Sequence, residues 1–173
     1  MLLHDGYIGR NVFIHTVKGD DEGSFNPDSF VTRAEFCAFI ARFAKLEEDI
    51  ADAFSDVDES KWYAGSIGAA YKAGIVSGDG DTFRPEDRIT REEAAAILSR
   101  LEVIKNAEIK NAATIFTDDE EISSWAKTAV DTMTALGIIA GVTETEFAPK
   151  AEMTRAMTVV MLSRIDMLTK NGG

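Results

Sequence analysis

The chain has 173 residues, enough for one compact domain or for a few small units that share a core. Its composition, 45% hydrophobic and 28% charged, is typical of a globular protein. Its 18 basic and 30 acidic residues give a formal net charge of -12, which disfavours binding to nucleic acid or to an anionic membrane. No apolar run reaches the roughly 20 residues that span a bilayer. The single cysteine, Cys37, lies in an apolar run typical of a buried, unreactive thiol.

The first predicted unit, residues 1–48, contains Phe25-Asn26-Pro27 and, seven residues after the phenylalanine, Thr32-Arg33. Thr32 and Glu35 match a capping box, in which both side chains accept hydrogen bonds from backbone N–H groups at a helix start. Apolar residues follow at helical spacing, so we predict a helix that begins after Thr32. Upstream, we predict that this unit lacks a first helix and has a loop inserted from Lys18 to Gly23.

The second predicted unit, residues 49–110, opens with Phe54-Ser55-Asp56-Val57 and continues through Trp62 and a helix to Gly74-Ile75-Val76-Ser77-Gly78. We expect Gly74 to end that helix in the left-handed conformation. Phe83-Arg84-Pro85 and the capping box Thr90-Arg91-Glu92-Glu93 follow. The unit is therefore predicted to run helix, glycine loop, Phe-x-Pro turn, helix.

The third predicted unit, residues 111–173, repeats this order. Its elements are Phe116-Thr117-Asp118-Asp119, Trp125, Gly137 to Gly141, Phe147-Ala148-Pro149 and Thr154-Arg155-Ala156-Met157. Met157 replaces the capping glutamate, so this helix start should be weaker by a fraction of about 1 kcal/mol. No unit this small buries enough apolar surface alone, so we predict that the three pack into one all-α body.

The arginines after the threonines, Arg33, Arg91 and Arg155, are not explained by capping. A cation in the first turn faces the positive end of the helix dipole, which costs typically a few tenths of a kcal/mol. An ion pair with a carboxylate such as Asp56 or Asp118 would offset this cost, and so would an anionic ligand.

A second arginine recurs ten residues after each threonine and suits a structural place near a helix C-terminus; these residues are Arg42, Arg100 and Arg164. Trp62 and Trp125 are predicted in the first turn of their helices. They fit either core packing or an aromatic face presented to a sugar.

The Phe-Ser-Asp-Val opening, the tryptophan, Gly-Ile-x-x-Gly, Phe-x-Pro and Thr-Arg-Ala-Glu, in this order, resemble the S-layer homology repeat. The resemblance implies a pseudo-threefold helical assembly whose inter-repeat grooves bind secondary cell wall polysaccharide, commonly through pyruvylated N-acetylmannosamine. It implies that the motif arginines meet the negative charge and that the other residues form groove walls. The residues so implied are Arg33, Arg91, Arg155, Asp56, Asp118, Trp62, Trp125, Gly74 and Gly137.

The resemblance also implies a non-catalytic module of an extracellular protein in the cell wall or S-layer, with other surface proteins as further candidate partners. No cofactor or metal is predicted. Neither His4 nor His15 has a repeated partner, and no Gly-x-Ser-x-Gly, His-Glu-x-x-His or P-loop spacing occurs. The EF-hand frame from Asp79 reaches Thr90, not a glutamate, at its twelfth position.

One alternative is a helical scaffold for protein–protein interaction at the cell surface that uses its arginines internally. If the grooves bind ligand, we expect the one around the second unit to be strongest. Asp56, Trp62, Gly74 and an intact capping box occur together there.

Overall fold

The computed structural model describes residues 24–50 and 53–171. Regular secondary structure in these residues is helical and consists of α2 (Arg33–Phe43), α3 (Ala64–Lys72), α4 (Arg91–Leu98), α5 (Glu102–Lys105), α6 (Lys127–Ala135), α7 (Arg155–Asn171) and a 3-10 turn at Asp119–Glu121. The described ranges contain isolated β-bridges but no strand. The predicted all-α class is confirmed.

The unusual features predicted for the first unit, its missing helix and the inserted loop from Lys18 to Gly23, lie outside the described residues. Within the described part, no helix is both long enough and apolar enough to cross a bilayer.

Three backbone hydrogen bonds join the repeats in a closed ring. The N–H of Val31 donates to the carbonyl of Met153, Met153 donates to Ile89, and Ile89 donates to Val31, with N to O distances of 2.9, 2.9 and 3.0 Å. Each of these residues stands immediately before the threonine of its repeat, and all three are fully buried. The repeats are therefore related by a pseudo-threefold axis.

Each Thr-Arg helix begins against the Phe-x-Pro turn of the next repeat in the ring. The first two N–H groups of a helix have no intrahelical partner, and here carbonyls of the neighbouring turn accept from them. The pairs are Arg33 to Asp87 and Ala34 to Pro85, Arg91 to Ala151 and Glu92 to Pro149, and Arg155 to Ser29 and Ala156 to Pro27. The order is thus first to second, second to third and third to first.

The two predicted capping boxes are both formed. The backbone N–H of Thr32 donates to Glu35 and that of Thr90 to Glu93, each at 2.9 Å, and the threonine hydroxyls accept in return. In the third copy, the hydroxyl of Thr154 still accepts from the N–H of Met157 at 3.3 Å. Half of that box is therefore retained.

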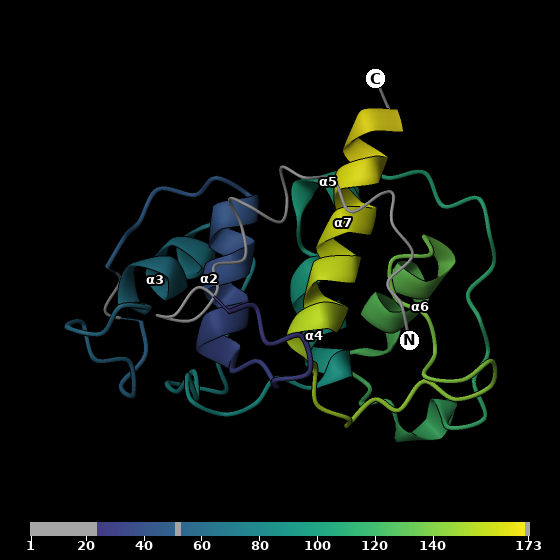
Figure 1. The fold of residues 1–173 in the computed structure, drawn as a ribbon, viewed down its shortest axis with the longest axis horizontal. Helices are drawn as coiled ribbons and strands as arrows, with labels where there is room; N and C mark the ends of the chain where they lie inside the picture. Colours follow the sequence, from purple (N-terminus) through teal and green to yellow (C-terminus); the bar gives the residue numbers. More distant parts are fainter. Residues whose placement is uncertain (1–23, 51–52, 172–173) are drawn as a thin grey trace.

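The second helix of one repeat packs on the first helix of the next. Helix α2 lies against α3, and α4 lies against α6 (Figure 1). The predicted apolar stripe forms the buried centre, with Phe39, Ile97 and Met161 each 4% exposed. Burial raises the pKa of Cys37 to about 12, which suits the unreactive role predicted for its thiol.

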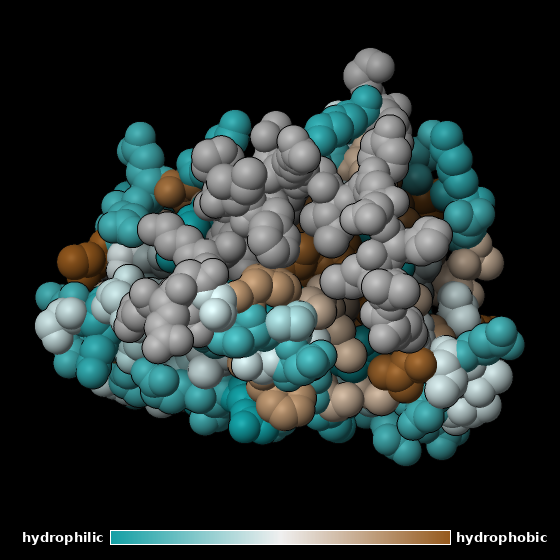
Figure 2. Space-filling view, in the orientation of Figure 1, coloured by the Kyte–Doolittle hydropathy of each residue, from teal (hydrophilic) through white to brown (hydrophobic). Residues whose placement is uncertain are grey.

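Two ion-pair clusters mark the junction between the second and third repeats. The buried carboxylate of Glu92 accepts from the backbone N–H and the hydroxyl of Ser123 and from Lys150. At the axis, Arg88 lies over the ring of Phe30 at 4.5 Å and bonds to Glu152 at 2.7 Å. Hydrophilic side chains dominate the left and right margins of the face in Figure 2, where hydrophobic residues show as separate spots.

Candidate ligand-binding groove

Each motif arginine is buried against the Phe-x-Pro turn of the next repeat, with Arg33, Arg91 and Arg155 being 5, 3 and 8% exposed. In each case the Nε donates to the carbonyl of the turn phenylalanine at 2.8 Å. The guanidinium also lies over a phenylalanine ring of that turn, 4.8 to 5.4 Å from its centroid. These contacts offset the unfavourable helix dipole.

The outer ends of the three guanidinium groups meet different partners. Arg33 bonds to Glu93 at 2.8 Å, and the same carboxylate oxygen accepts from Arg84 at 2.9 Å. Arg155 lies 3.8 Å from the equivalent Glu35. Arg91 donates to the carbonyl of Ala140 at 2.6 Å. Burial lowers the pKa of Arg33, and Glu93 partly offsets that effect.

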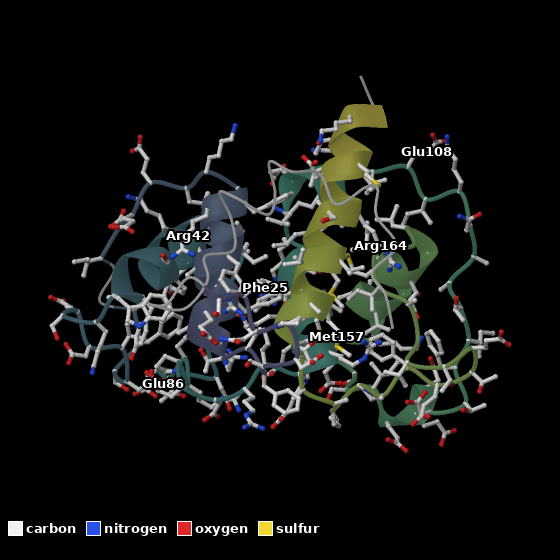
Figure 3. The ribbon with its side chains drawn as sticks, viewed as in Figure 1. Phe25, Arg42, Glu86, Glu108, Met157 and Arg164 are labelled. Carbon is white, nitrogen blue, oxygen red and sulfur yellow. The ribbon has the colours of Figure 1, made fainter. Side chains whose placement is uncertain are left out.

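The equivalent of Glu93 in the third repeat is Met157. Figure 3 shows Met157 in the first turn of α7, with Arg164 farther along the same helix. The third repeat therefore supplies no capping-box carboxylate to the preceding arginine, Arg91, and Asp118 is the acid whose charge acts on it.

The predicted acidic residues hold the Phe-x-Pro turns. The carboxylate of Asp56 accepts from the N–H groups of Phe83 and Arg84 at 2.8 and 2.7 Å. Asp118 accepts likewise from Phe147 and Ala148 at 2.9 and 2.6 Å. The middle residues of these turns are left-handed, with φ of 58° and 55°, so the carboxylates stabilise a strained backbone. Each acid thus fixes the turn that an arginine of the preceding repeat contacts.

The pKa of Asp118 reflects this role. Partial burial acts to raise it, but the hydrogen bonds from the N–H groups of Phe147 and Ala148, together with the attraction to Arg91, outweigh burial, and the pKa lies below its ordinary value of 3.8.

Residues from all three repeats line a pocket of about 410 Å³ beside α4. The first repeat contributes Arg33, the third contributes Trp125, and the second contributes Ser77, Gly78, Asp79, Arg84, Glu93, Ala96, Ile97 and Arg100. The pocket thus combines three guanidinium groups with a tryptophan that is 59% exposed. This arrangement can bind an anionic group and the apolar face of an attached ring.

The structure brings only two of the sequence-predicted ligand residues, Arg33 and Trp125, into this pocket. Arg91, Arg155, Asp56, Asp118, Trp62, Gly74 and Gly137 are not among its lining residues. The second unit was expected to group Asp56, Trp62 and Gly74 in one groove, but its pocket takes its tryptophan from the third repeat and one arginine from the first. The reason is the ring, which places each motif arginine on the turn of the next repeat.

The tryptophans lie slightly outside their predicted positions. Trp62 and Trp125 each lie two residues before the first residue of α3 and α6, and both are exposed. Gly74 and Gly137 do end those helices, each with a φ of +69°, as the glycine stops predicted.

Sequence reasoning missed two cationic residues of the pocket. Arg84 occupies the variable position of Phe-x-Pro, where the other copies have Asn26 and Ala148, and a basic residue in one copy was the available signal. Arg100 does make structural contacts, donating to the carbonyl of Ile75 and the hydroxyl of Ser77, but it also faces the pocket.

Gly78 was also missed as part of the pocket. A Cβ there would lie 2.3 Å from the carbonyl oxygen of Thr82, so only glycine fits. Across the described residues, no cluster of three or more His, Cys, Asp or Glu side chains could hold a metal ion.

The S-layer homology domain family model matches residues 17–37, 53–95 and 115–156, one segment in each predicted repeat and more than half of the chain. The chain therefore belongs to the S-layer homology domain family. This membership supports a role in anchoring at the cell surface.

Similar stretches occur within much larger proteins. The chain is 43% identical over 161 residues to an amylopullulanase of Thermoanaerobacterium thermosulfurigenes, covering 91% of this chain and 8% of the relative. It is 44% identical over 151 residues to the exoglucanase XynX of Acetivibrio thermocellus, with coverages of 86% and 14%. It is 32% identical over 152 residues to the S-layer protein sap of Bacillus anthracis, with coverages of 87% and 18%. The chain thus spans less than a fifth of each of these relatives.

Proposed function

We propose that this module anchors a larger surface protein non-covalently to an anionic secondary cell wall polysaccharide. The observation that carries the proposal is the gathering of Arg33, Arg84 and Arg100 in one pocket of a chain whose net charge is -12. Because the protein as a whole repels polyanions, a pocket in which three arginines outnumber the carboxylates of Asp79 and Glu93 marks the place where a negative group can bind. The ligand class proposed is a glycan with a pyruvylated N-acetylmannosamine residue.

The pocket residues have distinct roles in this proposal. Arg100 donates to two neutral groups and forms no ion pair with a carboxylate of the described residues, so it is the first candidate for the pyruvyl carboxylate. Arg84 and Arg33 share the carboxylate of Glu93, which the ligand would have to share or displace. The exposed ring of Trp125 offers a flat surface for the sugar.

Two further grooves follow from the pseudo-threefold arrangement. Arg91 and Arg155 are the equivalents of Arg33, and Trp62 is the equivalent of Trp125. Asp56 and Asp118 would act in these sites by fixing turns, and Gly74 and Gly137 by shaping the loops that lead into them.

The general proposal is tested by sedimenting the protein with purified wall sacculi before and after the wall polymer is chemically extracted. We expect co-sedimentation only with the unextracted sacculi. Equal binding to both would assign the module to a protein or peptidoglycan partner instead.

The pocket is tested by calorimetry with a pyruvylated saccharide. The change Arg84→Ala should weaken binding tenfold or more, because a charge-assisted hydrogen bond contributes about 1.5–3 kcal/mol and about 1.4 kcal/mol is a decade. The matched control is Arg88→Ala, which removes the same charge from an exposed side chain that does not line the pocket. An equal loss in both variants, or unchanged affinity for the saccharide without its pyruvyl group, would contradict the proposal.

A further inference from the structure

A second pocket, of about 400 Å³, adjoins the first. It shares Ala96, Arg100 and Trp125 with the first pocket, so the tryptophan side chain lines both. Its other walls come from α6, through Thr128 and Thr132, and from the connector after α4, through Ile104 and Ile109. Each pocket is of a size that holds a small organic group such as a sugar ring.

The chemistry of the second pocket differs from that of the first. Its lining residues include apolar side chains and hydroxyl groups but no carboxylate. The charge of Lys105 is matched by a hydrogen bond to Glu102 at 2.7 Å, and Glu102 is not part of the lining. The other cation, Arg100, is shared with the first pocket, so the walls that belong to the second pocket alone suit a ligand with apolar faces and hydroxyl groups but no charge.

The connector that builds this pocket is longer than the corresponding connection in the preceding repeat. From Leu101 to Phe116 the chain advances 15 positions, whereas from the equivalent Phe43 to Phe54 it advances 11. Figure 1 shows the connector leaving α5 and running round the outer side of α6 to the 3-10 turn. Ile109, within this longer connector, lines the second pocket together with Trp125.

We propose that the two pockets form one continuous groove for two consecutive sugar residues of the same glycan, with Trp125 between them. The first pocket holds the charged residue, and the second holds the uncharged sugar next to it. This inference rests on the proposed function and adds a subsite to it. The shared tryptophan is the physical basis, because one aromatic side chain then contacts both residues of a single chain.

The test compares the affinity for a pyruvylated monosaccharide with that for the same residue linked to one uncharged sugar, by calorimetry on the whole chain. The disaccharide should bind about tenfold more tightly. Ile109→Ala, which removes an exposed wall of the second pocket, should reduce this advantage to about threefold or less while leaving the monosaccharide affinity unchanged. Ala129→Phe, which fills the same pocket from α6, should do likewise.

The matched control is Ile115→Ala, on the same connector but outside both pockets, which should leave both affinities unchanged. Equal binding of the two saccharides by the unaltered chain overturns the subsite but not the anchoring proposal. A loss of both affinities in Ile109→Ala, with a native circular dichroism spectrum, also overturns the subsite. No binding of either saccharide overturns both proposals.

Discussion

Arg33 and Arg91 stand at the same position of successive repeats and make the same inner contacts, yet their outer surroundings differ. Arg33 shares the carboxylate of Glu93 with Arg84, whereas Arg91 ends on the carbonyl of Ala140. The sequence difference is a single residue of the next repeat, Glu93 in one case and Met157 in the other. One motif arginine therefore serves in a largely buried ion pair. Its equivalent donates to backbone carbonyls, and the charge that acts on it is that of Asp118, with which it forms no ion pair.

This difference shows that the arginine of the Thr-Arg motif has two separate roles, one structural and one electrostatic. The contact between Nε and the turn carbonyl is common to all three repeats and joins neighbouring units. The outer nitrogens vary with the neighbour, so the electrostatic role of each arginine is decided by a residue outside its own repeat. Substitutions at the two arginines should therefore have unequal effects.

The largest expected effect is the loss of Arg33. Arg33→Ala leaves Glu93 with only Arg84 as its cationic partner in a largely buried place, so it should lower the free energy of unfolding by about 3 kcal/mol. Arg91→Ala leaves Asp118 with both of its N–H donors and should cost about 1–2 kcal/mol, with the fold intact. Urea denaturation of both variants measures the difference. If Arg91→Ala proves the more damaging change, the distinction drawn between the two sites is wrong.

An intermediate effect is expected from exchanging the residues that make the difference. Met157→Glu completes the capping box of Thr154 and offers Arg91 a carboxylate, so it should raise the free energy of unfolding by about 1 kcal/mol. Glu93→Met should lower it by about 2 kcal/mol because it removes a cap and an ion pair. Met167→Glu, at a similarly exposed position of the same helix, is the control and should change little.

The smallest expected effect concerns how stability depends on pH through Asp118, which holds the turn that Arg91 contacts. The pKa of Asp118 is lowered in the folded protein, so its contribution to stability is complete above the ordinary value of 3.8 and is lost as the pH falls through the folded value. Thermal unfolding between about pH 5 and pH 2 should therefore show a shallower fall in Tm for Asp118→Asn than for the unaltered protein. Glu120→Gln, an exposed neighbour, should keep the slope of the unaltered protein.

Local order in this fold could be predicted from sequence because its signals are local. Thr32 and Thr90 begin helices, and Gly74 and Gly137 end them, through hydrogen bonds and dihedral angles set within a few residues. The repeat frame of the three prolines also located the turns correctly. These features do not depend on which repeat lies next to which.

The composition of the pocket could not be predicted in the same way. Nothing within the first repeat indicates that Arg33 will meet Glu93, or within the third that Trp125 will face Arg100 and Arg84. Those encounters are set by the direction in which the ring closes, and a repeated sequence looks the same for either direction. Asp56 was expected to pair with arginine or ligand, but it supports the turn because its carboxylate lies within reach of two N–H groups.

The ring of hydrogen bonds through Val31, Ile89 and Met153 runs in one direction. The order of the repeats along the chain therefore determines which repeat contacts which. Cyclic reordering, in which the first repeat is moved behind the third, keeps every neighbour and every matched contact. Exchanging the second and third repeats would separate Glu92 from Ser123 and bring Arg33 to Met157 in place of Glu93. Although the repeats share one sequence pattern, each is specific to its position: a circular permutation of their order conserves the assembly, and an exchange of two repeats does not.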